Sequence, residues 1–389
     1  MGLFDFLKGK KDKAPEPEEP VNQPQAQVDV QPQNKAGISF RTDSISPDVI
    51  PIEKRMRGKE PTCDGLYPHE VLVLSYAHKY FDTDTDFQNF WWYQYGIKDM
   101  QGVLQSLTVR GYITRGSIMD AVLAEKLPAI KDALKKHELK VSGKKNELAQ
   151  RLADSVSEDE LSQLFPKRPY AVTEQGAEIL KKYEWIPYIH AHRIEDLDIW
   201  NLTEMVQTPP YMKYRDKIWG YLNQKSMDYA AASKFGLYRN TRFEMSEFDA
   251  EEGKLDWAFH LLCEVIAYDL SGVGNNFDPE FFYMEAAHFF PYEHSIVIMA
   301  PGVTNRLFRY GLLLEYDDPD IREKLIEEIG KLSLPYRLFT PEECADIVFA
   351  ERDKDKEALS RIYENAEKKF NATELGKKAQ KAKNGEWVW

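Results

Sequence analysis

The feature that most constrains the fold is a pair of short amphipathic segments joined by a basic turn, between residues 127 and 164. Apolar residues recur at helical spacing on both sides of the turn. They are Leu127, Ile130 and Leu134 before it and Leu148, Leu152 and Val156 after it. The pair Ser142-Gly143 interrupts the two periods. The pattern therefore predicts a helical hairpin.

The turn carries a local excess of positive charge. Residues 127–151 hold seven cations and three anions, a net of +4, whereas the 389-residue chain carries −13. We predict Ser142 as the N-cap of the second helix, which leaves the amides of Gly143, Lys144 and Lys145 without intrahelical acceptors. A helix start flanked by lysines attracts anions, and the phosphate of a nucleic acid fits this description.

Residues 139–148 read Leu-Lys-Val-Ser-Gly-Lys-Lys-Asn-Glu-Leu and match the pattern L-x-x-S-G-K-K-x-E-L. At these positions the sequence resembles a SAP domain. The resemblance implies binding of DNA, or sometimes RNA, through the start of the second helix and its lysines. The nucleic-acid-binding residues predicted in the hairpin are Lys136, Lys140, Ser142, Gly143, Lys144, Lys145 and Arg151. The alternative is a solvated hairpin whose lysines serve solubility.

The segments on either side of the hairpin predict a small α+β domain. A helix opening at Tyr67-Pro68, an aromatic cluster at 87–95 and a helix around 100–107 precede a strand at 112–115. After the hairpin, residues 170–172 predict a second strand, and residues 177–183 predict a closing helix. This order is similar to a winged-helix domain. We expect strand 112–115 to pair with 170–172 as the wing, with the SAP-like hairpin inserted at 118–165.

Cations near the predicted wing extend the predicted interface. Arg115, Lys167 and Arg168 flank the strands and are predicted to contact phosphates. In a winged helix the third helix enters the major groove. Its outer face here would offer Lys98, Gln101, Gln105, Ser106 and Arg110. A packing or dimerisation module remains open as the alternative.

Residues 1–60 are rich in Pro, Gln and Glu after a short apolar and lysine-containing start, and they predict a disordered tether. The start, residues 1–11, would suit docking on a membrane surface or on a partner, without stable insertion. Three dispersed cysteines, with no secretory signal and no long apolar run, predict a cytoplasmic protein.

Residues 195–389 predict an acidic domain of helices, with 36 acidic and 24 basic residues. Helices are expected over 211–221, 227–248, 255–270, 279–290, 304–314, 320–332 and 341–383. Small residues from Gly253 to Ala267 approximate the spacing of a tetratricopeptide-type hairpin. We expect this half to bind a protein partner.

Catalytic signatures are missing from the sequence. There is no phosphate loop, G-x-G-x-x-G, G-x-S-x-G or H-E-x-x-H pattern. His190 and His192 form an H-x-H for which we predict a structural role, and Glu251 and Glu252 are predicted to be solvated turn charges. We predict no enzyme, no metal and no cofactor.

The motif order as a whole resembles prophage-associated, SAP-domain-containing proteins of Gram-positive bacteria. The motifs are D-G-L-Y-P-H-E, F-W-W-Y-Q-Y-G, S-G-K-K and V-T-E-Q-G, with Val172 where leucine is usual. The expected fold is mainly α: a winged-helix-like domain at 61–194 with the inserted hairpin, and a helical domain at 195–389. The resemblance implies a nucleic-acid-binding accessory protein. A structural or scaffolding protein of a phage or mobile element is the alternative, and an unrecognised enzyme is a third possibility.

Overall fold

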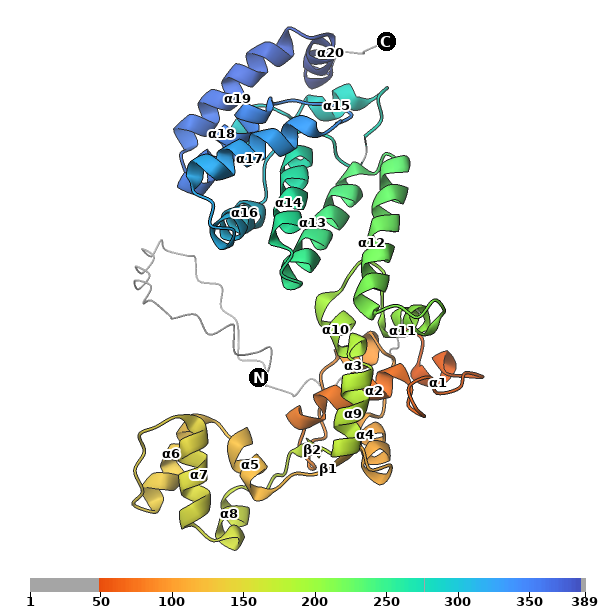
Figure 1. Ribbon diagram of the computed structural model, residues 1–389, viewed down its shortest axis with the longest axis vertical. Coiled ribbons are helices and arrows are strands. Elements are labelled where there is room, and N and C mark those ends of the chain that lie inside the picture. Colours follow the sequence, from red (N-terminus) through yellow and green to blue (C-terminus); the bar gives the residue numbers. More distant parts are fainter. Residues whose placement is uncertain (1–48, 276, 386–389) are drawn as a thin grey trace, which may run out of the picture. The chain divides into compact units, whose positions relative to one another are not determined.

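The computed structural model describes residues 49–275 and 277–385, and within these ranges the chain is mainly helical, as predicted (Figure 1). The predicted apolar start, most of the tether and the last four residues lie outside the described ranges. The final part of the predicted tether contains a four-residue helix, α1 (Ile52–Arg55). No helix in the described ranges is long and apolar enough to cross a bilayer.

The first structured part is a group of helices around a two-stranded sheet. Its elements are α2 (Pro68–Tyr76), a 3-10 turn η2 (Ala77–Lys79), α3 (Phe90–Tyr93), α4 (Met100–Val109), β1 (Ile113–Arg115), β2 (Tyr170–Val172) and α9 (Glu174–Lys182). Local capping fixes the helix starts. Pro68 occupies the first turn of α2, and Asp99 accepts the Gly102 amide at the start of α4.

β1 and β2 pair antiparallel, with Ile113 opposite Val172 and Arg115 opposite Tyr170. The predicted pairing of 112–115 with 170–172 is therefore confirmed. Thr173 caps α9 and donates its hydroxyl to the Tyr112 carbonyl, which ties the helix to β1. Gly176 in the first turn of α9 lies directly against that carbonyl, so a Cβ atom there would overlap the carbonyl oxygen.

Four helices occupy the stretch between the two strands, and they share a core of their own. They are α5 (Ile118–Ala124), α6 (Leu127–Lys136), α7 (Lys145–Ser155) and α8 (Glu158–Leu164). Ile130, Leu134, Leu148 and Leu152 are fully buried in that core, and every residue of the core lies between 118 and 165. We call residues 118–165 the inserted module. Its predicted hairpin corresponds to α6 and α7.

The remaining helices follow one another along the chain. They are α10 (Trp185–His192), α11 (Ile199–Gln207), α12 (Tyr214–Ala231), α13 (Phe235–Glu251), α14 (Leu255–Asp269), α15 (Phe282–Ala286), the 3-10 turn η3 (Tyr292–His294), α16 (Pro301–Leu313), α17 (Asp318–Lys331), α18 (Pro341–Asp353), α19 (Lys356–Asn371) and α20 (Glu374–Lys383). Neighbours such as α12 and α13, α13 and α14, and α18 and α19 pack together. One core joins the first part to Leu222, Met245 and Phe248, so it continues past residue 194.

Three of the predicted helices are wrong in extent. The predicted helix 211–221 ends too early, because α12 continues to Ala231. The predicted helix 227–248 is broken because Ser233 adopts a left-handed φ of 56° between α12 and α13. The predicted helix 279–290 contains only α15. The helices predicted over 341–383 are present as α18, α19 and α20, which are divided at Lys354 and before Thr373. The predicted start at Thr340 is confirmed, since its hydroxyl accepts the Glu343 amide.

The contact of Gly176 with β1 predicts a stability change. Gly176→Ala should lower the free energy of unfolding by about 1–3 kcal/mol, because the added methyl group forces α9 away from the Tyr112 carbonyl. Urea unfolding followed by circular dichroism measures this. Gly220→Ala is the matched control: its Cβ meets no atom within 4 Å in α12, so it should be neutral or stabilising. Equal effects of the two variants would contradict the packing argument.

Candidate nucleic-acid interface

The turn between α6 and α7 differs from the prediction in its cap. The N-cap of α7 is Lys144, and Ser142 lies exposed in the turn, so the predicted Ser142 cap is wrong. Gly143 adopts φ 138°, a conformation that favours glycine, and Lys144 is extended. The Glu147 carboxylate accepts the Lys144 backbone N–H at 3.1 Å. These two features delay the helix start by two residues.

Arg151 holds the turn in place. Its Nη1 donates to the carbonyl oxygens of Lys140 at 2.5 Å and Ser142 at 3.2 Å. The guanidinium is therefore engaged by the backbone of the turn that carries the lysines. Arg151 acts as a positioning residue for the turn, and its remaining N–H groups are the part of it that a phosphate would meet.

Four lysines surround the turn. Lys136, Lys140 and Lys144 are exposed and Lys145 is partly exposed. Within residues 118–165 the ion pairs of the structure are Lys135 with Asp132 at 3.2 Å and His137 with Glu160 at 3.5 Å. The four lysines of the turn thus form no ion pair with any described residue. Within residues 49–275 and 277–385, no carboxylate lies within ion-pair distance of these four ammonium groups.

The start of α7 adds partial positive charge to this surface. The backbone amides of its first turn have no intrahelical acceptor, as at any helix start. Lys145 and Asn146 belong to that turn, whereas Glu147 places a carboxylate beside it. An incoming anion would therefore meet the lysine ammonium groups together with the amides, and Glu147 would oppose it.

The predicted wing cations are in three different situations. Arg115 is exposed but pairs with Asp82 at 2.8 Å. Lys167 is exposed. Arg168 is only 8% exposed, and it donates from Nη2 to the Ser162 hydroxyl at 2.8 Å and from its backbone to Asp82. Arg168 therefore connects α8 to the strand region, and a phosphate outside the protein cannot reach it in this conformation.

The outer face of α4 offers little charge. Arg110 pairs with Glu70 at 2.7 Å and also donates to the Gly65 carbonyl. Gln101 donates to the Asp84 carbonyl at 2.8 Å. This leaves Lys98 and Gln105 as the exposed polar side chains predicted for major-groove contact.

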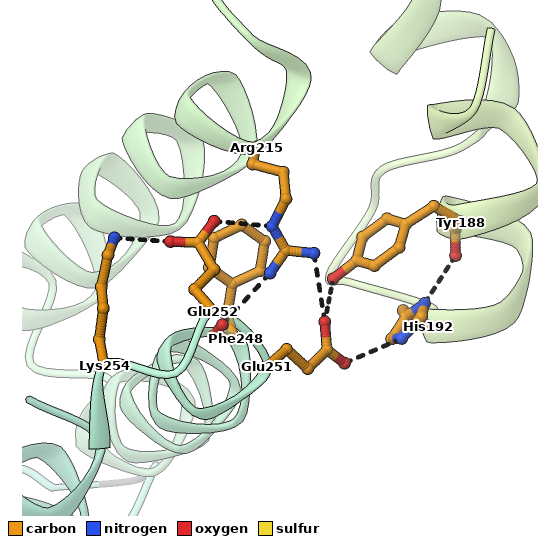
Figure 2. Close-up of polar contacts among 7 residues, drawn as sticks. All are labelled: Tyr188, His192, Arg215, Phe248, Glu251, Glu252 and Lys254. Carbon is orange, nitrogen blue, oxygen red and sulfur yellow. Dashed lines mark hydrogen bonds and ion pairs between the residues drawn. The ribbon is translucent and has the colours of Figure 1, made fainter. Parts of the chain in front are cut away.

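A second polar cluster lies where α10 meets α12 and α13 (Figure 2). We call it the junction cluster, and it comprises Tyr188, His192, Arg215, Glu251, Glu252 and Lys254. Three side chains contact the carboxylate oxygens of Glu251: the Tyr188 hydroxyl at 2.9 Å, His192 Nε2 at 2.9 Å and Arg215 Nη1 at 3.2 Å. Arg215 Nε also donates to Glu252 at 2.7 Å, and its guanidinium lies 3.9 Å from the centre of the Phe248 ring.

The prediction that Glu251 and Glu252 are solvated turn charges is correct in that both residues are exposed and Glu252 lies in the turn, but it misses their partners. Glu251 is the last residue of α13, and both carboxylates are paired. No local pattern signals this, because the partners come from helices far apart in the sequence. The structural role predicted for His190 agrees with its contacts: the Tyr76 hydroxyl lies 2.8 Å from Nε2 and the Tyr95 hydroxyl lies 2.5 Å from Nδ1. Burial lowers the pKa of His190.

No group of three or more His, Cys, Asp or Glu side chains in residues 49–275 and 277–385 is arranged to hold a metal ion. Comparison with protein-family models, curated proteins and solved structures finds no match.

The bonds from Arg151 to the turn predict a local stability effect. Arg151→Met should lower the free energy of unfolding by about 1 kcal/mol, because the carbonyls of Lys140 and Ser142 lose their donor. It should also speed hydrogen exchange at the Lys144 amide, which donates to Glu147 across the turn. Lys135→Met is the control, since its exposed ion pair contributes little. Unchanged exchange in the turn of Arg151→Met would contradict the positioning role.

Proposed function

We propose that the inserted module binds the phosphate backbone of a nucleic acid, most naturally DNA, through the α6–α7 turn. The observation that supports this proposal is a set of four lysines on a turn held by Arg151. Lys136, Lys140, Lys144 and Lys145 form no ion pair with any residue that the structure describes. In a chain of net charge −13 the binding must come from such a local surface. RNA would meet the same phosphate chemistry.

The expected binding is modest and sensitive to salt. Each phosphate that a lysine neutralises contributes about 0.9 to the slope of log K against log salt on duplex DNA. Four lysines therefore give a slope of at most about 4, far below that of a large regulatory dimer. Contacts of this kind position a protein on a duplex and do not select a sequence.

The proposed setting of the module is a winged-helix-like domain at 61–194. The paired strands β1 and β2, with α9 following, support the wing. The ion pair of Arg110 and the burial of Arg168 support the inserted module as the main contributor to the proposed interface, with Lys167 and Arg115 as additional proposed contacts. We infer a cytoplasmic accessory protein that is not an enzyme.

The acidic half, 195–389, is proposed to bind a protein partner, in an arrangement of helices that resembles tetratricopeptide hairpins. Large apolar side chains are exposed on it. They include Met227 at 58%, Trp257 at 63% and Leu312 at 74% exposure. Acidic charge disfavours nucleic acid on this half and leaves protein contacts as its role.

The proposal is tested by fluorescence anisotropy of the full chain with short labelled duplexes across a salt series. Lys144→Gln with Lys145→Gln should weaken binding and reduce the salt slope by about 1–2, because two phosphate contacts are lost. The matched control is Lys378→Gln with Lys381→Gln, which removes the same charge from exposed positions in α20. The control should bind like the wild type.

Two outcomes would contradict the proposal. One is the absence of binding by the wild type at low salt, which would favour the scaffolding alternative. The other is equal weakening in both double variants, which would show a response to net charge rather than to the turn. A single-stranded DNA and an RNA duplex in the same series distinguish the type of nucleic acid.

The separate core of the inserted module predicts that it folds alone. A fragment of residues 116–167 should show helical circular dichroism and a cooperative thermal transition, since all of its core residues lie within it. Its melting temperature should be modest because a domain of this size buries little surface. Replacing Leu148 by Ala, which is fully buried, should abolish the transition, whereas Gln150→Ala on the exposed face should not.

A further inference from the structure

The imidazole of His192 stacks on the Tyr188 ring, with 3.9 Å between the ring centres, and each of its two nitrogens faces a hydrogen-bond acceptor. Its Nδ1 lies 2.8 Å from the Tyr188 carbonyl oxygen, and its Nε2 lies 2.9 Å from a carboxylate oxygen of Glu251 (Figure 2). A carbonyl oxygen and an ionised carboxylate both accept and cannot donate. Both bonds therefore form together only when both ring nitrogens carry a proton. A neutral ring loses one of the two.

The charged groups around His192 come from three helices. Glu251 and Glu252 belong to the end of α13 and its C-cap, and Lys254 follows them. Arg215 comes from α12, and it contacts the same carboxylate as His192. The Tyr188 hydroxyl on α10 and the neighbouring Tyr214 ring on α12 complete the surroundings. Glu251 is the group that favours the protonated ring, and Arg215 opposes it.

Together these groups favour the protonated form of His192 and the ionised form of Glu251. The hydrogen bond to Glu251 raises the pKa of His192 above its ordinary value, although burial and Arg215 act in the other direction. For Glu251, burial raises the pKa, but the hydrogen bonds from His192, Tyr188 and Arg215 outweigh it and lower the pKa overall. The ordinary values are 6.5 for His192 and 4.5 for Glu251.

The pair adds a polar contact to a shared apolar core. Ile186 and Ile189 of α10 and Met245 and Phe248 of α13 belong to one buried cluster. Glu251 on α13 receives both Tyr188 and His192 of α10. A change at His192 therefore acts on the direct polar connection between α10 and α13.

We propose that His192 and Glu251 form a proton-operated latch that ties α10 to α13 when both are charged and loosens when His192 loses its proton. The latch does not depend on nucleic-acid binding.

The pKa shifts of His192 and Glu251 determine how the stability of the latch changes with pH. His192 has a raised pKa in the folded state, so its contribution is complete below pH 6.5 and is lost as the pH rises through the folded pKa. Glu251 has a lowered pKa, so its contribution is present above pH 4.5 and is lost as the pH falls through its folded pKa. The latch is therefore strongest between these limits, in mildly acidic solution.

The test compares the full chain with His192→Gln between pH 5.5 and pH 8.0. Glutamine retains a donor but carries no charge, so the melting-temperature difference between wild type and variant should be largest at pH 5.5 and should shrink by pH 8.0. His294→Gln is the control, because His294 is exposed and makes no side-chain hydrogen bond or ion pair with any residue in the described ranges. Its difference from the wild type should not change with pH. The other histidines are the same in the wild type and in each variant, so their effects on the melting temperature cancel in both differences.

Two local measurements keep the proposal falsifiable if the variant folds poorly. The histidine Cε1–H resonances of the wild type should show His192 titrating above pH 6.5, and Glu251→Gln should shift the His192 titration downward. Hydrogen-exchange protection at residues 188–193, corrected for intrinsic exchange, should fall between pH 5.5 and pH 8.0 in the wild type and not in His192→Gln. A titration of His192 at or below pH 6.5, or equal protection changes in both proteins, would overturn the latch.

Discussion

The short antiparallel pairing of β1 with β2 is the constraint on which the first part of the structure depends. Ile113 and Val172 lie opposite each other although 58 positions separate them in the numbering, so closing this ladder encloses a large loop. The loop folds on itself as four helices with a separate core, which limits the entropy that the closure must overcome. Thr173 and Gly176 then place α9 against the Tyr112 carbonyl.

Between α4 and β2, the arginines bond to other groups of the protein, whereas the lysines of the α6–α7 turn face solvent. Arg110, Arg151 and Arg168 donate to carbonyls, a hydroxyl or a carboxylate of the protein, as suits a planar group with several fixed donors. The lysines of the α6–α7 turn remain in solvent, where a flexible ammonium group is well hydrated and can meet a phosphate in several geometries. Counting cations in the sequence does not make this distinction, and the proposed interface is accordingly smaller than the predicted residue list.

The sequence is most informative where periodicity and capping act locally. The mainly helical fold, the pairing of 112–115 with 170–172 and the start at Thr340 all follow from such signals. The helix breaks at Ser233 and Lys354 cannot be predicted from such local signals. Each depends on one non-glycine residue in a left-handed conformation that the surrounding structure imposes. The cap of α7 shifts for a related reason, since Gly143 extends the turn. The pairing of Glu251 depends on three helices and has no signature in any one of them.

The inserted module leaves and re-enters the rest of the chain at adjacent points. Arg115 and Tyr170 are partners in the ladder, and the Gly116 amide donates to the Pro169 carbonyl at 2.7 Å. A short hairpin loop can join two such strands, so the chain with residues 117–168 replaced by a tight turn retains the same strand ends. The module is thus a cassette. Because its core is separate and its two ends lie side by side in the ladder, substitutions on its surface can change what the module contacts without altering the strand pairing that carries it.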